Sequence, residues 1–133
     1  MSDSNTYTII VKRPDDIFKI DISAPKELND AQQHQYAVRR SRAFNDAVDL
    51  FLYIRKRYKD TKEFNIDFNM VNFRKMCRHN GDEEETLMIE MLQSLLAGYG
   101  FIPVCVGFPL NEQGEVADDT ILNLHFKKSI ASV

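Results

Sequence analysis

The chain has 133 residues and a mass of 15.4 kDa, with 44% hydrophobic and 28% charged residues, which is the size and composition of one soluble globular domain. No apolar run is long enough for a membrane span, and the polar start lacks a signal-peptide pattern. Cys77 and Cys105 are too few for a disulfide framework, so we expect two reduced thiols in a cytoplasm.

The net charge of −3 conceals an uneven distribution of charge along the chain. Residues 12–78 hold fifteen of the seventeen Lys and Arg against ten Asp and Glu, whereas residues 79–126 hold nine acidic residues and no Lys or Arg. Screening limits each charge to a range of about 8–10 Å, so segregated charge favours a locally basic surface. The competing interpretation is that these charges only solvate helix faces.

The first half of the chain predicts strand and then helix. Residues 6–11 are β-branched and aromatic and predict a strand. Residues 17–22 fit either a short helix or a second strand. Residues 29–58 contain no Gly or Pro and predict a helix capped by Asn29 or Asp30. The first half of this helix is too polar for core and fits a separate or protruding helix.

The second half predicts three more strands and a short helix. Residues 62–70 alternate between apolar and polar side chains, which is typical of a half-buried strand. Residues 71–79 predict a short helix. Residues 101–108 and 120–126 predict two strands joined by a polar loop, with Pro103 on an edge or a bulge because it cannot donate to a ladder.

One further helix is the best-marked element. Asp82 is suited to cap it, with Glu85 three positions later completing a capping box. An apolar stripe then repeats at three-to-four spacing, formed by Leu87, Met88, Met91, Leu92, Leu95 and Leu96. Gly98 or Gly100 supplies the left-handed residue that ends the helix.

Together these elements predict an α+β fold in a single domain over residues 1–133. We expect an antiparallel sheet of about four to five strands, with one long helix and two shorter helices packed on it. His34, His79 and His125 are isolated, no nucleophile arrangement or phosphate-binding glycine loop is recognisable, and the His and Cys spacing is not that of zinc. We therefore expect no enzyme, no cofactor and no metal.

Three segments, in the same order, resemble the RegA translational repressors of T-even bacteriophages. They are Ile9–Ile20 (IIVKRPDDIFKI), Phe73–Cys105 (FRKMCRHNG, an acidic run, then LLAGYGFIPVC) and Leu122–Lys128 (LNLHFKK). Residues 21–62 resemble the family poorly. The resemblance implies a small RNA-binding phage protein in the cytoplasm of an infected bacterial host. It would occupy the single-stranded initiation region of early mRNAs and block ribosome binding, which needs no catalysis.

The resemblance also implies the RNA-binding residues. They are Lys12, Arg13 and Lys19 near the N-terminus, Arg74, Lys75 and Arg78 in the basic helix, and Phe126 and Lys127 at the end of the last strand. Residues 21–25 lack the family's longer basic helix, and Arg39, Arg40 and Arg42 are candidates to compensate. From its strand position alone Phe126 would face the core; the resemblance shifts it towards stacking on a base.

The residues alone offer one more basic segment and one competing function. Arg55 to Lys62 is rich in cations interleaved with Tyr53 and Tyr58, the two ingredients that single-stranded nucleic acid requires. Alternatively, two helices separated at Asn80-Gly81 and followed by a hairpin have the order of a degenerate winged-helix module acting on DNA or on a host protein. A homodimer, through an edge strand or the outer half of the long helix, is compatible with both hypotheses.

Overall fold

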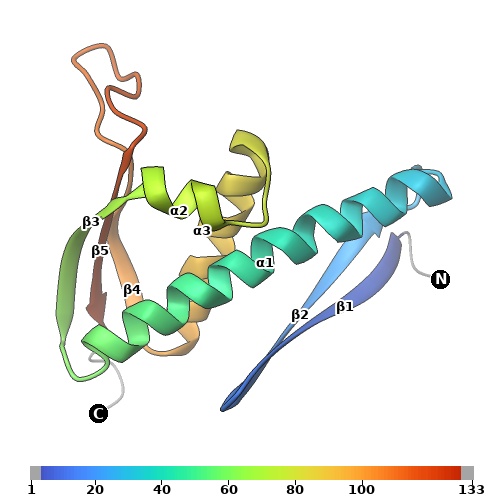
Figure 1. The fold of residues 1–133 in the computed structure, drawn as a ribbon, viewed down its shortest axis with the longest axis horizontal. Coiled ribbons are helices and arrows are strands. Elements are labelled where there is room, and N and C mark those ends of the chain that lie inside the picture. The colour runs from blue at the N-terminus through green and yellow to red at the C-terminus, as the bar shows by residue number, and fades with distance from the viewer. Residues whose placement is uncertain (1–3, 130–133) are drawn as a thin grey trace. The chain divides into compact units, whose positions relative to one another are not determined.

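The structure is a computed structural model and describes residues 4–129. The predicted α+β fold class is confirmed, with five antiparallel strands, one long helix and two shorter helices. The elements are, in chain order, β1 (Ser4–Arg13), β2 (Asp16–Pro25), α1 (Asp30–Tyr58), β3 (Glu63–Asn69), α2 (Met70–Met76), α3 (Gly81–Gly98), β4 (Phe101–Gly107) and β5 (Ile121–Lys128). The strands divide between two sheets, β1-β2 and β3-β5-β4 (Figure 1).

The chain forms two compact units. Of the described residues, the first unit contains 4–51 and 78–92, and the second contains 52–77 and 93–129. Helices α1 and α3 therefore each contribute residues to both units. Neither of them, nor any other helix in the described part of the chain, has the length and apolar composition needed to cross a bilayer.

In the first unit, β1 and β2 form a hairpin around the two-residue turn Pro14-Asp15. The segment 17–22, which the sequence left open between helix and strand, is a strand. Its partners explain this choice: Ile22 pairs with Tyr7 across the ladder and is buried, as are Ile9 and Val11 on the same face of β1. In a strand, every second side chain points to the same face, so the apolar residues of the hairpin form one apolar face. In a helix, residues with this spacing would point in different directions.

The long helix α1 is continuous rather than split at its polar first half. Asn29 caps it: the Gln32 N–H donates to Asn29 Oδ1 over 2.8 Å, and the Gln32 side chain accepts from the Asn29 N–H over 3.0 Å. The polar first half is held to the hairpin by the buried amide of Gln33, whose Oε1 accepts from the Tyr7 hydroxyl over 3.1 Å. A buried, hydrogen-bonded amide thus replaces the apolar stripe that was missing there.

In the second unit, aromatic rings fill the core of the three-stranded sheet. Phe64 of β3 stacks on Phe126 of the central strand β5 at 5.4 Å and on Tyr58 at 5.0 Å, and it meets Phe101 edge-on at 5.2 Å. The prediction for Pro103 is confirmed on both counts, because β4 is an edge strand and its register with β5 shifts between Pro103 and Cys105.

The best-marked helix, α3, starts before its predicted cap. It begins at Gly81, whose φ of +77° favours glycine, so Asp82 lies inside the first turn instead of capping it. Glu84, rather than Glu85, reaches back to accept a hydrogen bond from the backbone N–H of Asn80. The predicted apolar stripe is confirmed by its buried members Met88, Met91, Leu92 and Leu96.

Two glycines at the other end of α3 test which residue has the left-handed conformation after the helix. Gly98 is the last helical residue and has ordinary dihedrals, whereas Gly100 follows the helix with a φ of +95°; a Cβ at either would meet no atom within 4 Å. We expect Gly100→Ala to destabilise the protein by about 1–2 kcal/mol because of left-handed strain. Gly98→Ala should be neutral or stabilise it by up to about 1 kcal/mol. Urea unfolding of both variants measures the difference in their free energies of unfolding. Equal effects of the two substitutions would contradict a left-handed conformation at Gly100 alone.

Candidate nucleic-acid interface

Most of the predicted RNA-binding arginines of the first unit are engaged by carboxylates. Arg13 of β1 donates two hydrogen bonds to Asp49 Oδ1, from Nε over 3.1 Å and from Nη2 over 2.8 Å. Arg78 donates to the other oxygen of the same carboxylate over 2.8 Å. Asp49 is exposed on α1, so this pairing draws both arginines to one point on that helix.

A second carboxylate holds two more of these arginines. Arg42 donates to both oxygens of Glu84 over 3.0 Å each, and Arg39 lies 3.6 Å from the same carboxylate. The Glu84 side chain is only 2% exposed. Burial would raise the pKa of Glu84, but the hydrogen bonds from Arg42 and from the Asn80 N–H outweigh it and lower that pKa. Arg42 therefore has a structural partner that must stay charged.

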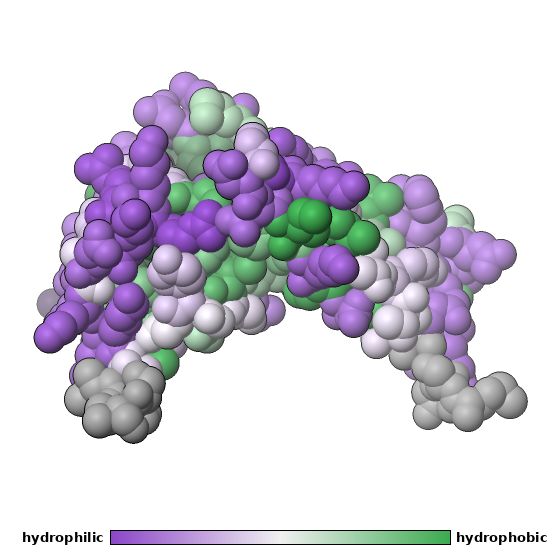
Figure 2. All heavy atoms as spheres, turned by 90° about the horizontal axis from the view of Figure 1, so that it is seen from below, coloured by the Kyte–Doolittle hydropathy of each residue, from purple (hydrophilic) through white to green (hydrophobic). Residues whose placement is uncertain are grey.

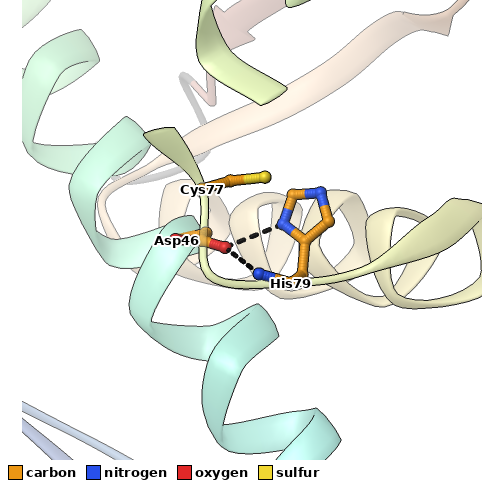
Figure 3. Close-up of side chains that lie close together, drawn as sticks. All are labelled: Asp46, Cys77 and His79. Atoms are coloured by element: carbon orange, nitrogen blue, oxygen red, sulfur yellow. Dashed lines mark hydrogen bonds and ion pairs between the residues drawn. The ribbon is translucent and has the colours of Figure 1, made fainter. Parts of the chain in front are cut away.

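A second buried carboxylate is that of Asp46, in the middle of α1 (Figure 3). Its Oδ2 accepts from the backbone N–H groups of Arg78 over 2.8 Å and His79 over 2.9 Å, and from His79 Nδ1 over 2.8 Å. The side chains of Asp46 and His79 are each 2% exposed. Burial would raise the pKa of Asp46, but these hydrogen bonds outweigh it and lower that pKa.

The same contacts keep His79 protonated. Its hydrogen bond with Asp46, and next its approach to Glu85 at 3.7 Å, raise the pKa of His79 from 6.5 to about 9. A buried imidazolium between two carboxylates satisfies all three charges. The sequence contained no signal for this arrangement, because Asp46 and His79 are 33 residues apart.

The remaining predicted cations of the first unit carry no carboxylate partner among the described residues. Lys12 and Lys19 are exposed and lie opposite Ile17 and Ile10 on the outer face of the hairpin. Arg40 is half-buried on the ring of Tyr36, with its guanidinium carbon 3.5 Å from the ring centroid. These three side chains are accessible to a ligand, but the first unit does not collect them with the paired arginines into one open basic surface.

In the second unit, one predicted contact is wrong. Phe126 was expected to be an exposed stacking ring, but it is 0% exposed. The reason is the alternation of β5, which points Phe126 to the same side as the buried Leu122 and Leu124 and stacks it on Phe64. Lys127, the next residue, is exposed on the other face of β5. Lys75 on α2 is also exposed. Arg74 is half-buried, and its guanidinium carbon lies 5.8 Å from the ring centroid of Phe108.

Lysines of the loop between α1 and β3 and of strand β5 meet where α1 ends, β3 begins and β5 ends. The Lys128 ammonium donates to the Lys59 carbonyl over 3.1 Å, and the Lys128 N–H donates to the Lys62 carbonyl over 2.6 Å. Lys127 lies opposite Glu63 in the ladder. We call Lys59, Lys62, Lys127 and Lys128 the lysine cluster. In the part of the chain that the structure describes, none of the four forms an ion pair.

One exposed aromatic ring lies beside the lysine cluster. The Lys128 ammonium is 5.7 Å from the ring centroid of Tyr99, a side chain 39% exposed. Tyr53 lies further back along α1: its ring is 45% exposed, packs edge-on against Phe68 at 6.1 Å and is 5.3 Å from the guanidinium carbon of Arg57. Tyr58, by contrast, is stacked on Phe64 and half-buried. Figure 2 shows hydrophilic side chains covering the left of the view, where Figure 1 has β3 and the end of α1.

Sequence reasoning identified the basic segment 55–62 but not its junction with Lys127 and Lys128. The pairing of β3 with β5 creates that junction across more than sixty positions of the chain. No family model, no curated protein and no solved structure matches this chain.

The carboxylate pairing separates arginines that stabilise the fold from those that have no carboxylate partner among the described residues. Arg42→Ala leaves the buried Glu84 without its bidentate partner, so we expect it to lower the free energy of unfolding by roughly 2–4 kcal/mol. Arg40→Ala, which removes the same charge two residues away, should cost less than about 1 kcal/mol. Chemical unfolding of the two variants measures this contrast, and an Arg42→Ala variant as stable as Arg40→Ala would contradict it.

The raised pKa of His79 predicts a pH dependence of stability. The folded protein binds this proton more tightly than the unfolded chain, so its stabilisation is fully present below pH 6.5 and is lost as pH rises to about 9. We expect the free energy of unfolding to fall by roughly 2–4 kcal/mol across that interval. Urea titrations at several pH values measure the fall, and an NMR titration of the imidazole measures the pKa itself. An imidazole that titrates near 6.5 would refute this account.

Proposed function

We propose that this protein binds single-stranded RNA through the lysine cluster and represses translation by occupying the initiation region of early phage mRNAs. The observation that carries the proposal is the cluster itself: four lysines from two distant segments of the chain, none of them in an ion pair among the described residues, beside the exposed ring of Tyr99. The resemblance of three ordered segments to RegA repressors supports the same function and a cytoplasmic site of action in an infected bacterium.

The chemistry of the cluster suits an unpaired strand. Ammonium groups on flexible stems neutralise phosphates wherever the backbone passes, and an adjacent ring gives one base a stacking surface. Stacking is worth about 1–3 kcal/mol for each base, and it requires that the base be free of a duplex. Cations and rings together therefore favour single-stranded over double-stranded nucleic acid.

Repression in this proposal is occupancy. A protein bound across the initiation region denies that stretch of RNA to the ribosome, and no bond is made or broken. The affinity is then set largely by counterion release from phosphates and falls as salt rises, by about 0.7 logarithmic units per phosphate contact for single strands. Arg42 and Arg78 contribute to this function through the fold, since carboxylates already hold them.

Two charge-matched double variants test the proposal. Lys62→Ala with Lys127→Ala removes two exposed charges from the cluster, and Lys12→Ala with Lys19→Ala removes two exposed charges from the hairpin. We expect the cluster variant to lose at least about tenfold in affinity for a short unpaired RNA and to lower the salt slope by about 1.4. The hairpin variant should lose less than about threefold. Fluorescence anisotropy titrations at two salt concentrations provide both numbers.

Three results would overturn the proposal. Equal losses in the two variants would mean that net charge, not the cluster, governs binding. A stronger affinity for duplex DNA than for unpaired RNA would support a DNA-binding module. Binding to neither nucleic acid, at low salt, would leave a protein as the partner.

The second candidate is a winged-helix module, and the topology favours it. From α1 onwards the order is helix, strand, helix, helix, strand, loop, strand, and the sheet order β3-β5-β4 places the last strand between the other two. That is the arrangement of winged-helix domains, which use their third helix on DNA. Here that helix, α3, carries five acidic residues and no Lys or Arg, and the loop from 108 to 120 carries four acidic residues and no basic one. Their charge repels phosphates, so this candidate binds a protein.

A further inference from the structure

A groove runs between β1 and the first half of α1 in the first unit. It has a volume of about 560 Å³. Four consecutive strand residues, 7–10, line one side, and one face of α1 lines the other, formed by Asp30, Gln33, His34, Ala37, Val38 and Ser41. Consecutive strand residues contribute because the groove follows the backbone of β1 rather than one of its faces.

The side of β1 that faces this groove is an unpaired strand edge. The sheet has two strands, β2 pairs with β1 along ten residues, and no other described strand adds to it. An isolated two-stranded ribbon is marginal in water, and a long open edge attracts another strand unless Pro, a bulge or inward charge protects it. From Tyr7 to Val11 the edge has none of these protections, and Ile10 is 51% exposed on it.

We propose that a second copy of this chain fills the groove, with β1 of one copy pairing antiparallel to β1 of the other about a twofold axis. The product is a four-stranded sheet in the order β2-β1-β1-β2 with the two α1 helices side by side on one face. Each copy closes the other's groove with the same residues, which is the isologous contact that closed dimers use.

Dimensions support this occupant. In each copy, one helix covers two strands of the four-stranded sheet. Neighbouring strands lie about 4.8 Å apart, so the axes of the two helices would lie two strand spacings, about 9.6 Å, apart. Packed helices lie about 8–10 Å apart. Ala37 and Ser41, one turn apart and half-buried in the groove, leave room for that approach. A peptide strand alone would pair with the edge but would leave the face of α1 uncovered.

Charge also fits a second copy. In each copy β1 and α1 run in the same direction, because Tyr7 contacts Gln33 and Arg13 contacts Asp49. Antiparallel pairing therefore carries the basic end of one strand, with the exposed Lys12, to the end of the groove where the other copy has Asp30. The like-charged ends of the two strands lie at opposite ends of the new ladder. This inference does not depend on RNA binding, because it uses none of the lysine cluster.

Sedimentation equilibrium of the full chain, from about 1 μM to about 1 mM, tests the proposal over the range of ordinary protein association. We expect a mass that rises from 15.4 kDa towards twice that value. Ala37→Glu places a charge in the groove of each copy and should weaken association at least about tenfold. Gln35→Glu adds the same charge to the same helical turn outside the groove and should associate like the unmodified protein.

Hydrogen exchange keeps the test decisive if Ala37→Glu destabilises the fold. In the unmodified protein, amides of β1 should gain protection as concentration rises, while those of β4, the edge strand of the other sheet, should not. A mass of 15.4 kDa at every concentration, association that is equal for the two variants, or protection of β1 that is independent of concentration would each overturn the proposal.

Discussion

The carboxylate of Asp46 is the constraint on which the first unit depends. It is buried in the middle of α1 and accepts two backbone N–H bonds and one imidazole bond from the consecutive residues Arg78 and His79. These bonds fix the chain just before α3 begins. A buried carboxylate without them would be costly by several kcal/mol, so the position of Arg78 and the charge of His79 follow from the burial of Asp46.

The same requirement decides which cations are available to a ligand. Three carboxylates form ion pairs with four of the arginines that were predicted to bind RNA. The carboxylates are those of Asp46, Asp49 and Glu84, and the arginines are Arg13, Arg39, Arg42 and Arg78. Charge that compensates a buried or nearby carboxylate adds little to the field felt by a phosphate. Lys12 and Lys19 stay accessible on the hairpin, and four further lysines without an ion pair among the described residues form the lysine cluster, where the ends of α1 and β5 meet the start of β3. This partition of charge is the central claim of the proposed function.

Local pattern predicted the elements well and their long-range partners poorly. Period-two alternation located β3 and β5, and the absence of Gly and Pro located α1. The missing N–H of Pro103 predicted an edge or a bulge, and the structure has both. The same alternation correctly predicts that Phe126 faces the core. The resemblance to RegA repressors predicted an exposed ring at this position, which is wrong. Ion pairs such as Arg42 with Glu84, 42 residues apart, and the division of the strands into two sheets leave no trace in local periodicity.

The most direct test of the central claim is an NMR titration of the ¹⁵N-labelled chain with a short unpaired RNA. The account predicts that the largest amide shift changes fall at residues 59–62, 99 and 127–128, and that they diminish together as salt is raised. Largest changes at residues 12–19 and 39–42, with the lysine cluster unmoved, would contradict it.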